Sequence, residues 1–341
     1  MRRSRGADWT MKACLVAPVL AATALALAGC NNGGSQSANA PAPTNGTANT
    51  TSSSGKKFII GFSQVTTAEP WRAVFNEQLR AEADKHPEVM LQIADANDKT
   101  EQQVQQMQNF ITQKVDAILV SPKESAGLTD VVAKAEDAGI PVFVLDRNVE
   151  GDKYTCFIGA DNVEIGRQAG KFAVQALGGP GKAKGNYVEV WGGFGTKPSA
   201  DRSKGFHDIV DNEKGIKLVG QKSDSDWKLE KAQQYTEGVL KLYPEIDLVF
   251  AHNDPMAMGA RQAAEAVGRA DKIKFIGIDG LPKEGVQYVK DGKLAATFLY
   301  PTPGVEGLKQ ALKKLHGETV EKKITLPTAT ITKENADQYA K

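Results

Sequence analysis

VDAILV at residues 115–120 leads through one predicted helix to PVFVLD at 141–146, and IDLVFA at 246–251 leads in the same way to KFIGID at 274–279. Each of these stretches is a short apolar run, which is typical of a strand that is buried on both faces. The second strand of each unit ends on an aspartate. This weak internal repeat predicts two similar α/β halves.

The rest of the chain continues the same alternation of apolar runs and amphipathic segments. Further strands are predicted at 58–62, 89–94, 187–191, 216–220 and 294–299, and the strands of the repeat are predicted at 117–120, 142–145, 248–251 and 273–278. Helices are predicted after Pro70 and at 100–113, 125–138, 164–177, 200–211, 229–242, 255–267, 283–290 and 305–316. Apolar strands that are separated by helices indicate parallel sheets covered on both faces.

The strand-ending aspartates Asp146 and Asp279 are the first candidate site residues. In open α/β sheets, ligands bind beyond the carboxyl ends of the strands. Two such sheets facing each other would direct both carboxylates into one cleft. The alternative is that each aspartate only begins a turn or caps a helix, which is common.

The chain starts with an export signal. Basic residues precede an apolar run, and the run ends at Leu27-Ala28-Gly29-Cys30. This ending resembles the lipobox of bacterial lipoproteins, in which the cysteine becomes the lipidated terminus; the alternative is an ordinary secretory signal with a chance cysteine. Residues 1–30 are therefore interpreted as a lipoprotein signal peptide. Residues 31–56 are dominated by small and polar side chains and are interpreted as a flexible tether.

Charge and cysteine content exclude several classes of protein. The whole chain has 42 Lys and Arg against 41 Asp and Glu, so nothing favours nucleic acid as a partner. Three cysteines are present, and only Cys156 would remain unmodified in the mature chain, so no intramolecular disulfide is expected. Cys156 lies in an apolar run, which indicates a buried small side chain, with a nucleophile as the alternative.

Motifs of enzymes and metal sites are not found. The glycine-rich stretches 178–182 and 192–197 lack the spacing of a phosphate-binding loop. The four histidines have no metal-ligand spacing, and no nucleophile elbow occurs. The sequence therefore predicts no catalytic residues, no metal and no cofactor.

Several ordered motifs carry a resemblance to a known family. They are IGFSQ at 60–64 followed by Trp71-Arg72, LDR at 145–147, GADN at 159–162, DRSKGF at 201–206, AHNDPMAMGA at 251–260 and IGIDG at 276–280. Together they resemble the periplasmic sugar-binding proteins of the ribose/galactose type, the receptors of ABC importers, over residues 57–341. The segment 62–72 is most similar to the galactofuranose-binding branch.

The resemblance implies an α/β fold of two doubly wound parallel-sheet lobes that are joined by a three-crossing hinge, with the ligand in the interlobe cleft. The crossings would be 159–161, 299–302 and 324–327. The amino-terminal lobe would comprise 57–160 plus 301–325, and the carboxy-terminal lobe 161–300 plus 326–341. It also implies a protein that passes a pentose or hexose to ABC permease subunits. Together with the lipobox at 27–30, the expectation is a monomer anchored by lipid in the periplasm or at the cell surface.

Hydroxyl-rich ligands suit the residues at the motif positions. Carboxylates accept from two hydroxyls, and guanidinium groups present donors in a plane. Aromatic rings cover the C–H face of a sugar. The predicted ligand-binding residues are Trp71, Arg72, Asp146, Arg147, Arg202, Trp227, Asn253 and Asp279.

Some of these candidates have competing interpretations. Trp71 and Trp227 could be core or surface side chains, and Arg202 could pair with an acidic neighbour on the surface. Asn97 is a further candidate in a loop that does not align cleanly with the family. Tyr300 stands where the family often has a polar contact from the hinge, which puts that contact in doubt.

Three other functions compete with the importer receptor. One is a sugar sensor that docks on a chemoreceptor or a membrane histidine kinase. Another is a sugar-responsive repressor, which is disfavoured because an export signal stands where a DNA-binding domain would be. An enzyme is the last, and no catalytic constellation supports it.

Overall fold

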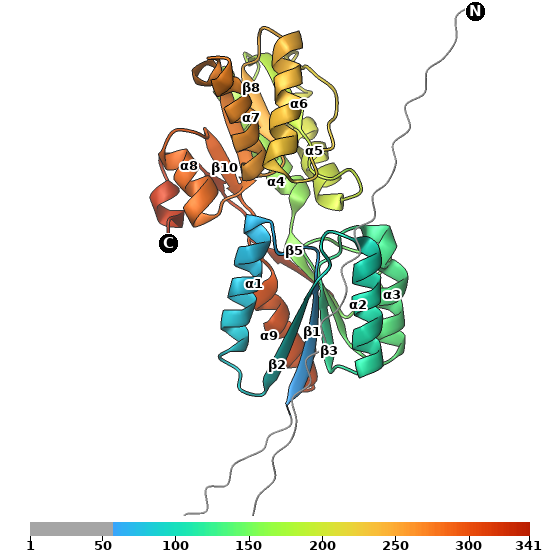
Figure 1. Ribbon diagram of the computed structural model, residues 1–341. Coiled ribbons are helices and arrows are strands. Elements are labelled where there is room, and N and C mark those ends of the chain that lie inside the picture. The colour runs from blue at the N-terminus through green and yellow to red at the C-terminus, as the bar shows by residue number, and fades with distance from the viewer. Residues whose placement is uncertain (1–56) are drawn as a thin grey trace, which may run out of the picture. The chain divides into compact units, whose positions relative to one another are not determined.

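The computed structural model describes residues 57–341. The predicted leader and tether, including Cys30 and the residues before it, lie outside the described residues. The described part forms two six-stranded sheets with helices on both faces (Figure 1). This is the predicted architecture of two doubly wound α/β lobes.

The first sheet is entirely parallel, in the order β11-β5-β4-β3-β1-β2. Its strands are β1 (Phe58–Gln64), β2 (Val89–Asp95), β3 (Ala117–Val120), β4 (Val142–Leu145), β5 (Cys156–Ala160) and β11 (Lys323–Leu326). Helices α1 (Pro70–Ala83) and α9 (Gly304–Leu315) pack together on one face, and α2 (Thr100–Gln113) and α3 (Ser125–Asp137) on the other (Figure 1). Every residue of β3 and β4 is buried, which explains their unbroken apolar sequences.

The second sheet has the order β12-β10-β9-β8-β6-β7, and β12 runs antiparallel to β10 at its edge. Its strands are β6 (Lys184–Val190), β7 (Gly215–Leu218), β8 (Leu248–Ala251), β9 (Lys274–Asp279), β10 (Ala296–Leu299) and β12 (Thr330–Ile331). Helix α4 (Asn162–Ala176) packs on α5 (Lys197–Val210), and α6 (Leu229–Leu242) on α7 (Asp254–Ala266).

The chain passes between the two sheets three times. It leaves the first sheet after β5, returns after β10 to form α9 and β11, and leaves again after β11 to form β12. The connections after β5 and after β11 are far apart in the sequence, but they leave the first sheet from neighbouring strands because β11 pairs with β5. Such an arrangement lets two lobes rotate about short crossings.

Several predicted bounds shift for local reasons. Helix α4 begins at Asn162 rather than 164, because the Asp161 carboxylate accepts the N–H groups of Val163 and Glu164, each at 3.0 Å. The predicted helix 283–290 is a five-residue π-type turn, η2 (Pro282–Val286), followed by the single helical turn α8 (Gln287–Lys290). Strands β5, β11 and β12 are not among the predicted strands; β11 and β12, at four and two residues, are too short to give a distinctive pattern.

Cys156 is fully buried in β5, and this burial raises the pKa of its thiol to about 11. A thiol that is buried and protonated packs as a small apolar side chain, so the nucleophile interpretation is wrong. Within residues 57–341 no helix combines the length and the apolar character needed to span a bilayer.

Candidate functional site

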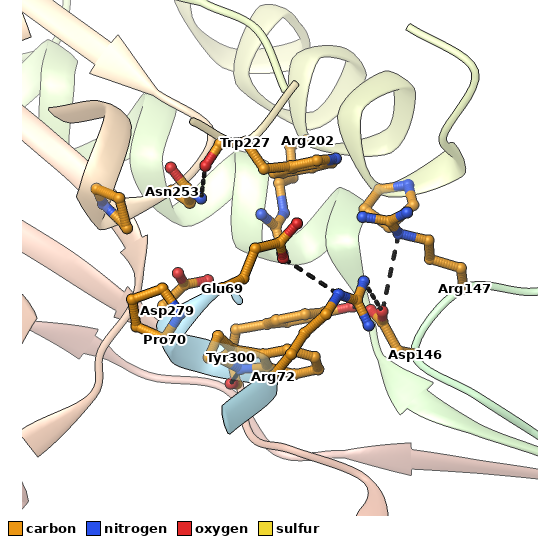
Figure 2. Close-up of a pocket in the computed structure, with 13 residues that line it drawn as sticks. Glu69, Pro70, Arg72, Asp146, Arg147, Arg202, Trp227, Asn253, Asp279 and Tyr300 are labelled. Atoms are coloured by element: carbon orange, nitrogen blue, oxygen red, sulfur yellow. Dashed lines mark hydrogen bonds and ion pairs between the residues drawn. The ribbon is translucent and has the colours of Figure 1, made fainter. Parts of the chain in front are cut away.

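A pocket lies between the two sheets and is lined by side chains from both (Figure 2). It contains about 430 Å³ of space, part of it open to solvent. The lining residues are Glu69, Pro70, Trp71, Arg72, Asp146, Arg147, Pro198, Arg202, Trp227, Asn253, Pro255, Asp279 and Tyr300. Nine of the ten predicted ligand-binding residues are therefore brought together in one place.

Asp146 stands directly after β4 in a left-handed backbone conformation, with φ of 68°. Its Oδ2 atom accepts from Arg72 Nη2 at 3.1 Å and from Ser121 Oγ at 3.2 Å. Its Oδ1 atom accepts from the Tyr300 hydroxyl. Because three protein donors already hold it, the Asp146 carboxylate has little free capacity and chiefly fixes its neighbours.

Arg72 lies in the first turn of α1 and is almost completely buried. Besides Asp146, its guanidinium donates to Glu69 Oε2 at 3.1 Å, to Gln64 Oε1 at 2.8 Å and to Ser121 Oγ at 3.0 Å. Four of its five N–H groups therefore have protein partners. Arg72 thus mainly holds Glu69 and Asp146 in place and has little capacity left to bind a ligand.

Arg147 has more free donors. Its Nη1 donates to the Lys123 carbonyl at 3.0 Å, and its Nε lies 3.8 Å from Asp146 Oδ2. The guanidinium carbon lies 5.3 Å from the centroid of Trp227. Burial and the nearby positive charge of Arg72 lower the pKa of Arg147. The remaining N–H groups are available to a ligand in the pocket.

Trp71 and Tyr300 form an aromatic stack at the pocket, with centroids 5.1 Å apart and an interplanar angle of 25°. The Trp71 indole N–H donates to the Tyr300 carbonyl at 2.8 Å, so a residue of α1 is tied to the crossing after β10. Tyr300 does contribute a polar group here, but its hydroxyl is used by Asp146.

Arg202 comes from α5 and is buried, so the alternative that it pairs with an acidic neighbour on the surface is wrong. Its Nε donates to Asn162 Oδ1 at 2.8 Å, and its Nη1 donates to the His252 carbonyl. The guanidinium lies 4.4 Å from the Tyr300 centroid and 5.4 Å from that of Trp227. Arg202 therefore lies between two aromatic rings at the junction of the lobes.

Trp227 precedes α6 and is only 8 % exposed. Its backbone φ is 63°, a left-handed conformation that is costly for a bulky residue. Gly192 makes room for the ring, because a Cβ atom there would lie 2.6 Å from the indole. The indole nitrogen has no partner among residues 57–341.

Asn253 and Asp279 complete the side formed by the second sheet. Asn253 caps α7 by accepting the Met256 N–H at 2.9 Å, and its Nδ2 donates to the Trp227 carbonyl at 3.2 Å. Asp279 ends β9 and is 6 % exposed. Its carboxylate forms no hydrogen bond or ion pair with any other residue drawn in Figure 2. Asp279 is thus the acidic group with free capacity.

Asn97 lies elsewhere. It is exposed in the loop between β2 and α2 and lines a neighbouring groove with Asp98 and Lys228. The loop turns through two left-handed residues, Asn97 and Asp98, which direct it to the rim.

Sequence reasoning did not single out Glu69, Pro70, Pro198 or Pro255; the prolines stand in the first turns of α1, α5 and α7, where Pro is common.

No cluster of three or more histidine, cysteine or acidic side chains suitable for a metal ion occurs in the part of the chain that the structure describes. The donors at the pocket are mainly guanidinium groups, which do not ligate metals. Guanidinium donors, carboxylate acceptors and aromatic rings together suit an oxygen-rich organic ligand.

Comparison with known proteins agrees with this geometry. Residues 60–319 match the model of the periplasmic binding protein domain. The chain belongs to the periplasmic binding protein family. The ribose import binding protein of Bacillus subtilis is 33% identical over 274 residues, covering 80% of this chain and 86% of that protein. The galactofuranose-binding protein of Escherichia coli is 34% identical over 282 residues, with the same two coverages.

Among solved structures, this periplasmic binding protein is similar to the fructose-binding periplasmic domain of a hybrid two-component system. The identity is 37%, the TM-score is 0.79, and the match covers 83% of this chain and 93% of that one. Identity at this level supports a common fold across both lobes.

Proposed function

We propose that this protein captures a monosaccharide between its two lobes and delivers it to the permease of an ABC importer. The observation that carries the proposal is the pairing at the pocket. Asp146 and Arg147 follow a strand of one sheet, and Asp279 with Arg202 faces them from the other. A ligand that satisfies both sets can hold the lobes together.

The free groups match the hydroxyls of a sugar. Arg147 offers N–H donors, and Asp279 offers a carboxyl group without a hydrogen-bond partner among the residues drawn in Figure 2. The Trp227 ring provides an apolar face for C–H bonds, and the guanidinium carbons of Arg147 and Arg202 lie 5.3 and 5.4 Å from its centroid. We infer that Arg147, Arg202, Trp227, Asn253 and Asp279 contact the sugar, while Arg72, Asp146, Trp71 and Tyr300 also hold the floor of the pocket.

The relatives narrow the class of ligand. Their names refer to ribose, galactofuranose and fructose. We infer a pentose or hexose, and the galactofuranose-like form is favoured by the 62–72 segment, whose Trp71 and Arg72 line the pocket. The lobes would divide at 160/161, 300/301 and 325/326, and closure about these crossings would enclose a single ring.

Calorimetry on site variants tests this proposal. After a thermal-shift screen of monosaccharides, Arg147→Ala and Asp279→Ala should each weaken binding of the selected sugar by on the order of 2–3 kcal/mol, roughly thirty- to hundredfold, because each leaves sugar hydroxyls without a partner in a buried pocket. The matched controls are Arg80→Ala and Asp130→Ala, at exposed helical positions. If both site variants bind within threefold of the parent, these residues do not form the sugar site.

A second function is favoured by one comparison. The similar fructose-binding domain belongs to a hybrid two-component system, so a sugar-sensing partner of a histidine kinase or chemoreceptor is the alternative. Uptake of the radiolabelled sugar separates the two functions. Deleting the gene should abolish high-affinity uptake if the protein serves an importer, and should abolish only the transcriptional or chemotactic response if it serves a sensor.

We further propose that the protein works as a monomer in the periplasm or at the cell surface, held by lipid on Cys30. The support is the sequence Leu27–Cys30, since Cys30 ends an apolar leader. Cys30→Ser should move the protein from the membrane fraction to the soluble fraction and leave sugar affinity unchanged. Equal membrane partitioning of the variant and the parent in cell fractionation would exclude the lipid anchor.

A further inference from the structure

Asp254 is a fully buried carboxyl group next to the site, and it has no cationic partner among the described residues. It begins α7, directly after Asn253. Its exposed fraction is 0%, and its oxygens accept from Gly280 N at 2.9 Å and from Thr297 Oγ1 at 2.8 and 2.9 Å. A buried carboxylate without a neutralising cation is costly, so its retention requires an explanation.

The surroundings of Asp254 leave space for this carboxyl group and for little else. A Cβ atom on Gly277 would lie 2.3 Å from Asp254 Oδ1, and one on Gly285 would lie 1.9 Å from Oδ2. These two glycines belong to β9 and to η2, on either side of the Asp279-Gly280 turn. Asp254 is therefore enclosed by the segment that carries Asp279.

The bond from Gly280 links Asp254 to the site directly. Asp279 and Gly280 have φ of 137° and 66°, and the Gly280 N–H that ends this turn donates to Asp254. The turn leaves the Asp279 side chain at the pocket, where none of the other residues drawn in Figure 2 bonds to it. Asp254 thus fixes the backbone that directs Asp279 toward a ligand.

The two carboxyl groups also interact through their charge. Burial raises the pKa of Asp254 to about 7. Burial and the negative charge of Asp254 raise the pKa of Asp279 well above its usual range. The other charged groups that act on the pair are Arg202, which opposes these shifts, and Glu69 and Glu284, which reinforce them; Tyr288 also faces Asp254. Two adjacent buried carboxyl groups cannot both ionise readily.

We propose that Asp254 is a positioning residue of the sugar site, which holds the Asp279 turn and keeps a proton on the Asp254–Asp279 pair. Asp279 then meets the sugar as both a donor and an acceptor. An ionised carboxylate only accepts, whereas a protonated carboxyl group can also donate to a ring or hydroxyl oxygen. This inference rests on the proposed function, because it assumes that Asp279 contacts the ligand.

The first test needs no ligand. Carbon-13 NMR measures the chemical shifts of the aspartate carboxyl carbons as a function of pH, in protein labelled at aspartate. The parent, Asp254→Asn and Asp279→Asn are compared. We expect a carboxyl group that titrates near pH 7 in the parent, and the signal of each remaining partner should titrate at lower pH in either variant. Glu284→Gln, which removes a nearby charge but no bond to the turn, is the control and should cause a smaller change.

If every aspartate of the parent titrates at ordinary acidic pH, or if neither variant moves its partner's titration, the proposal is wrong. Asp279→Asn keeps the test decisive if Asp254→Asn does not fold. Because no sugar is present, this result does not depend on the proposed function.

The second test measures affinity against pH with D-fructose, D-ribose, D-galactose and L-arabinose as probes. For a probe that binds the parent, affinity should fall about tenfold for each pH unit above the pH at which the Asp254–Asp279 pair loses its proton. Asp254→Asn should move this fall to lower pH. Asp279→Asn, which keeps a donor and an acceptor, should bind more tightly than Asp279→Ala and lose the pH dependence.

If Asp254→Asn has a lower melting temperature but the same dependence of sugar affinity on pH as the parent, Asp254 has only a structural role and the proposal is wrong. Failure of all four sugars to bind the parent would count against the proposed function instead, and the carboxyl titrations would still decide whether the pair shares a proton.

Discussion

Trp227 shows what a single residue contributes to this pocket. Its left-handed backbone conformation costs on the order of 1 kcal/mol or more, and the indole nitrogen has no hydrogen-bond partner in the described chain. Both features are unfavourable in themselves. They are retained at a position where the ring lies near the guanidinium groups of Arg147 and Arg202 and lines the pocket. Strain of this kind is consistent with a residue selected for the ligand.

Gly192→Ala tests this role of Trp227. The new Cβ would lie 2.6 Å from a rigid ring, so the indole must move. We expect sugar affinity to weaken about tenfold, which corresponds to roughly 1.4 kcal/mol, with a smaller loss of thermal stability. Gly238→Ala is the control, since its Cβ would meet nothing within 4 Å on α6. Unchanged affinity in calorimetry would show that the position of the ring does not matter for binding.

At this scale the sequence predicted which residues gather at the pocket, but not their partners. Asp146 and Arg202 are predicted to bind the ligand, but both also form hydrogen bonds within the protein. Asp146 accepts from Tyr300, and Arg202 donates to Asn162. The role of Asp254 was not predicted either. A charged residue at the start of a helix looks like an exposed cap, and its complete burial depends on glycines that are distant in sequence.

At the scale of elements, Glu189 joins three segments that carry the site. It lies in β6, and its Oε1 atom is 3.0 Å from Nε2 of His252, which follows β8, while its Oε2 atom is 3.1 Å from Nε2 of His207 in α5. The His252 carbonyl in turn accepts from Arg202. One carboxylate thus connects the sheet to the arginine at the junction of the lobes.

This network predicts a pH dependence of stability. The bond to Glu189 raises the pKa of His207 to about 9, and Asp211 adds to the effect. Because the unfolded chain binds that proton less tightly, the stabilisation is complete below about pH 6.5 and is lost as the pH rises through about 9. Glu189→Gln should lower the free energy of unfolding by on the order of 2 kcal/mol at pH 6.5, and by less at pH 10.

Urea denaturation at the two pH values measures this difference. Glu77→Gln, at an exposed position on α1, is the control and should have little effect at either pH. An equal loss for Glu189→Gln at both pH values would mean that the histidine bond does not contribute through its charge.

The sequence predicts elements well where their pattern is strong and local. Helices α2 and α6 and strands β3, β4 and β8 have the predicted bounds, because unbroken apolar runs and regular helical spacing define them. The sequence does not predict strands β5, β11 and β12; β11 and β12 are short, and each pairs with a strand that is distant in the chain. The helix predicted at 283–290 was interrupted where η2 wraps around Asp254.

At the scale of the whole molecule, contacts at the rim of the pocket join the two lobes. Lys228, just before α6, lies 3.3 Å from Asp98 of the loop after β2, and Asp98 also pairs with Lys123 at 2.6 Å. Lys228 pairs with Asp226 at 2.6 Å as well. Of these pairs, only Lys228–Asp98 joins the two lobes, so it forms only when the lobes are close and it favours the closed arrangement.

Closure by a hinge predicts a change of shape in solution. If the lobes separate without ligand, small-angle scattering should show a radius of gyration that falls when the bound sugar saturates the protein. Breaking the Lys228–Asp98 pair should then act mainly on opening. Lys228→Gln should increase the dissociation rate of the sugar about two- to fivefold, as expected for an exposed pair worth up to roughly 1 kcal/mol, and leave the association rate nearly unchanged. The difference should shrink in high salt, because screening weakens exposed charges.

Stopped-flow kinetics on the parent, Lys228→Gln and the exposed control Lys171→Gln measures these rates. If Lys228→Gln dissociates at the parental rate in low salt, the rim pair does not stabilise the closed form. If scattering is identical with and without saturating sugar, the lobes do not close on the ligand, and the pocket must admit it through the opening that already exists at its rim. The two measurements are independent, because the ion pair could be dispensable in a molecule that still closes.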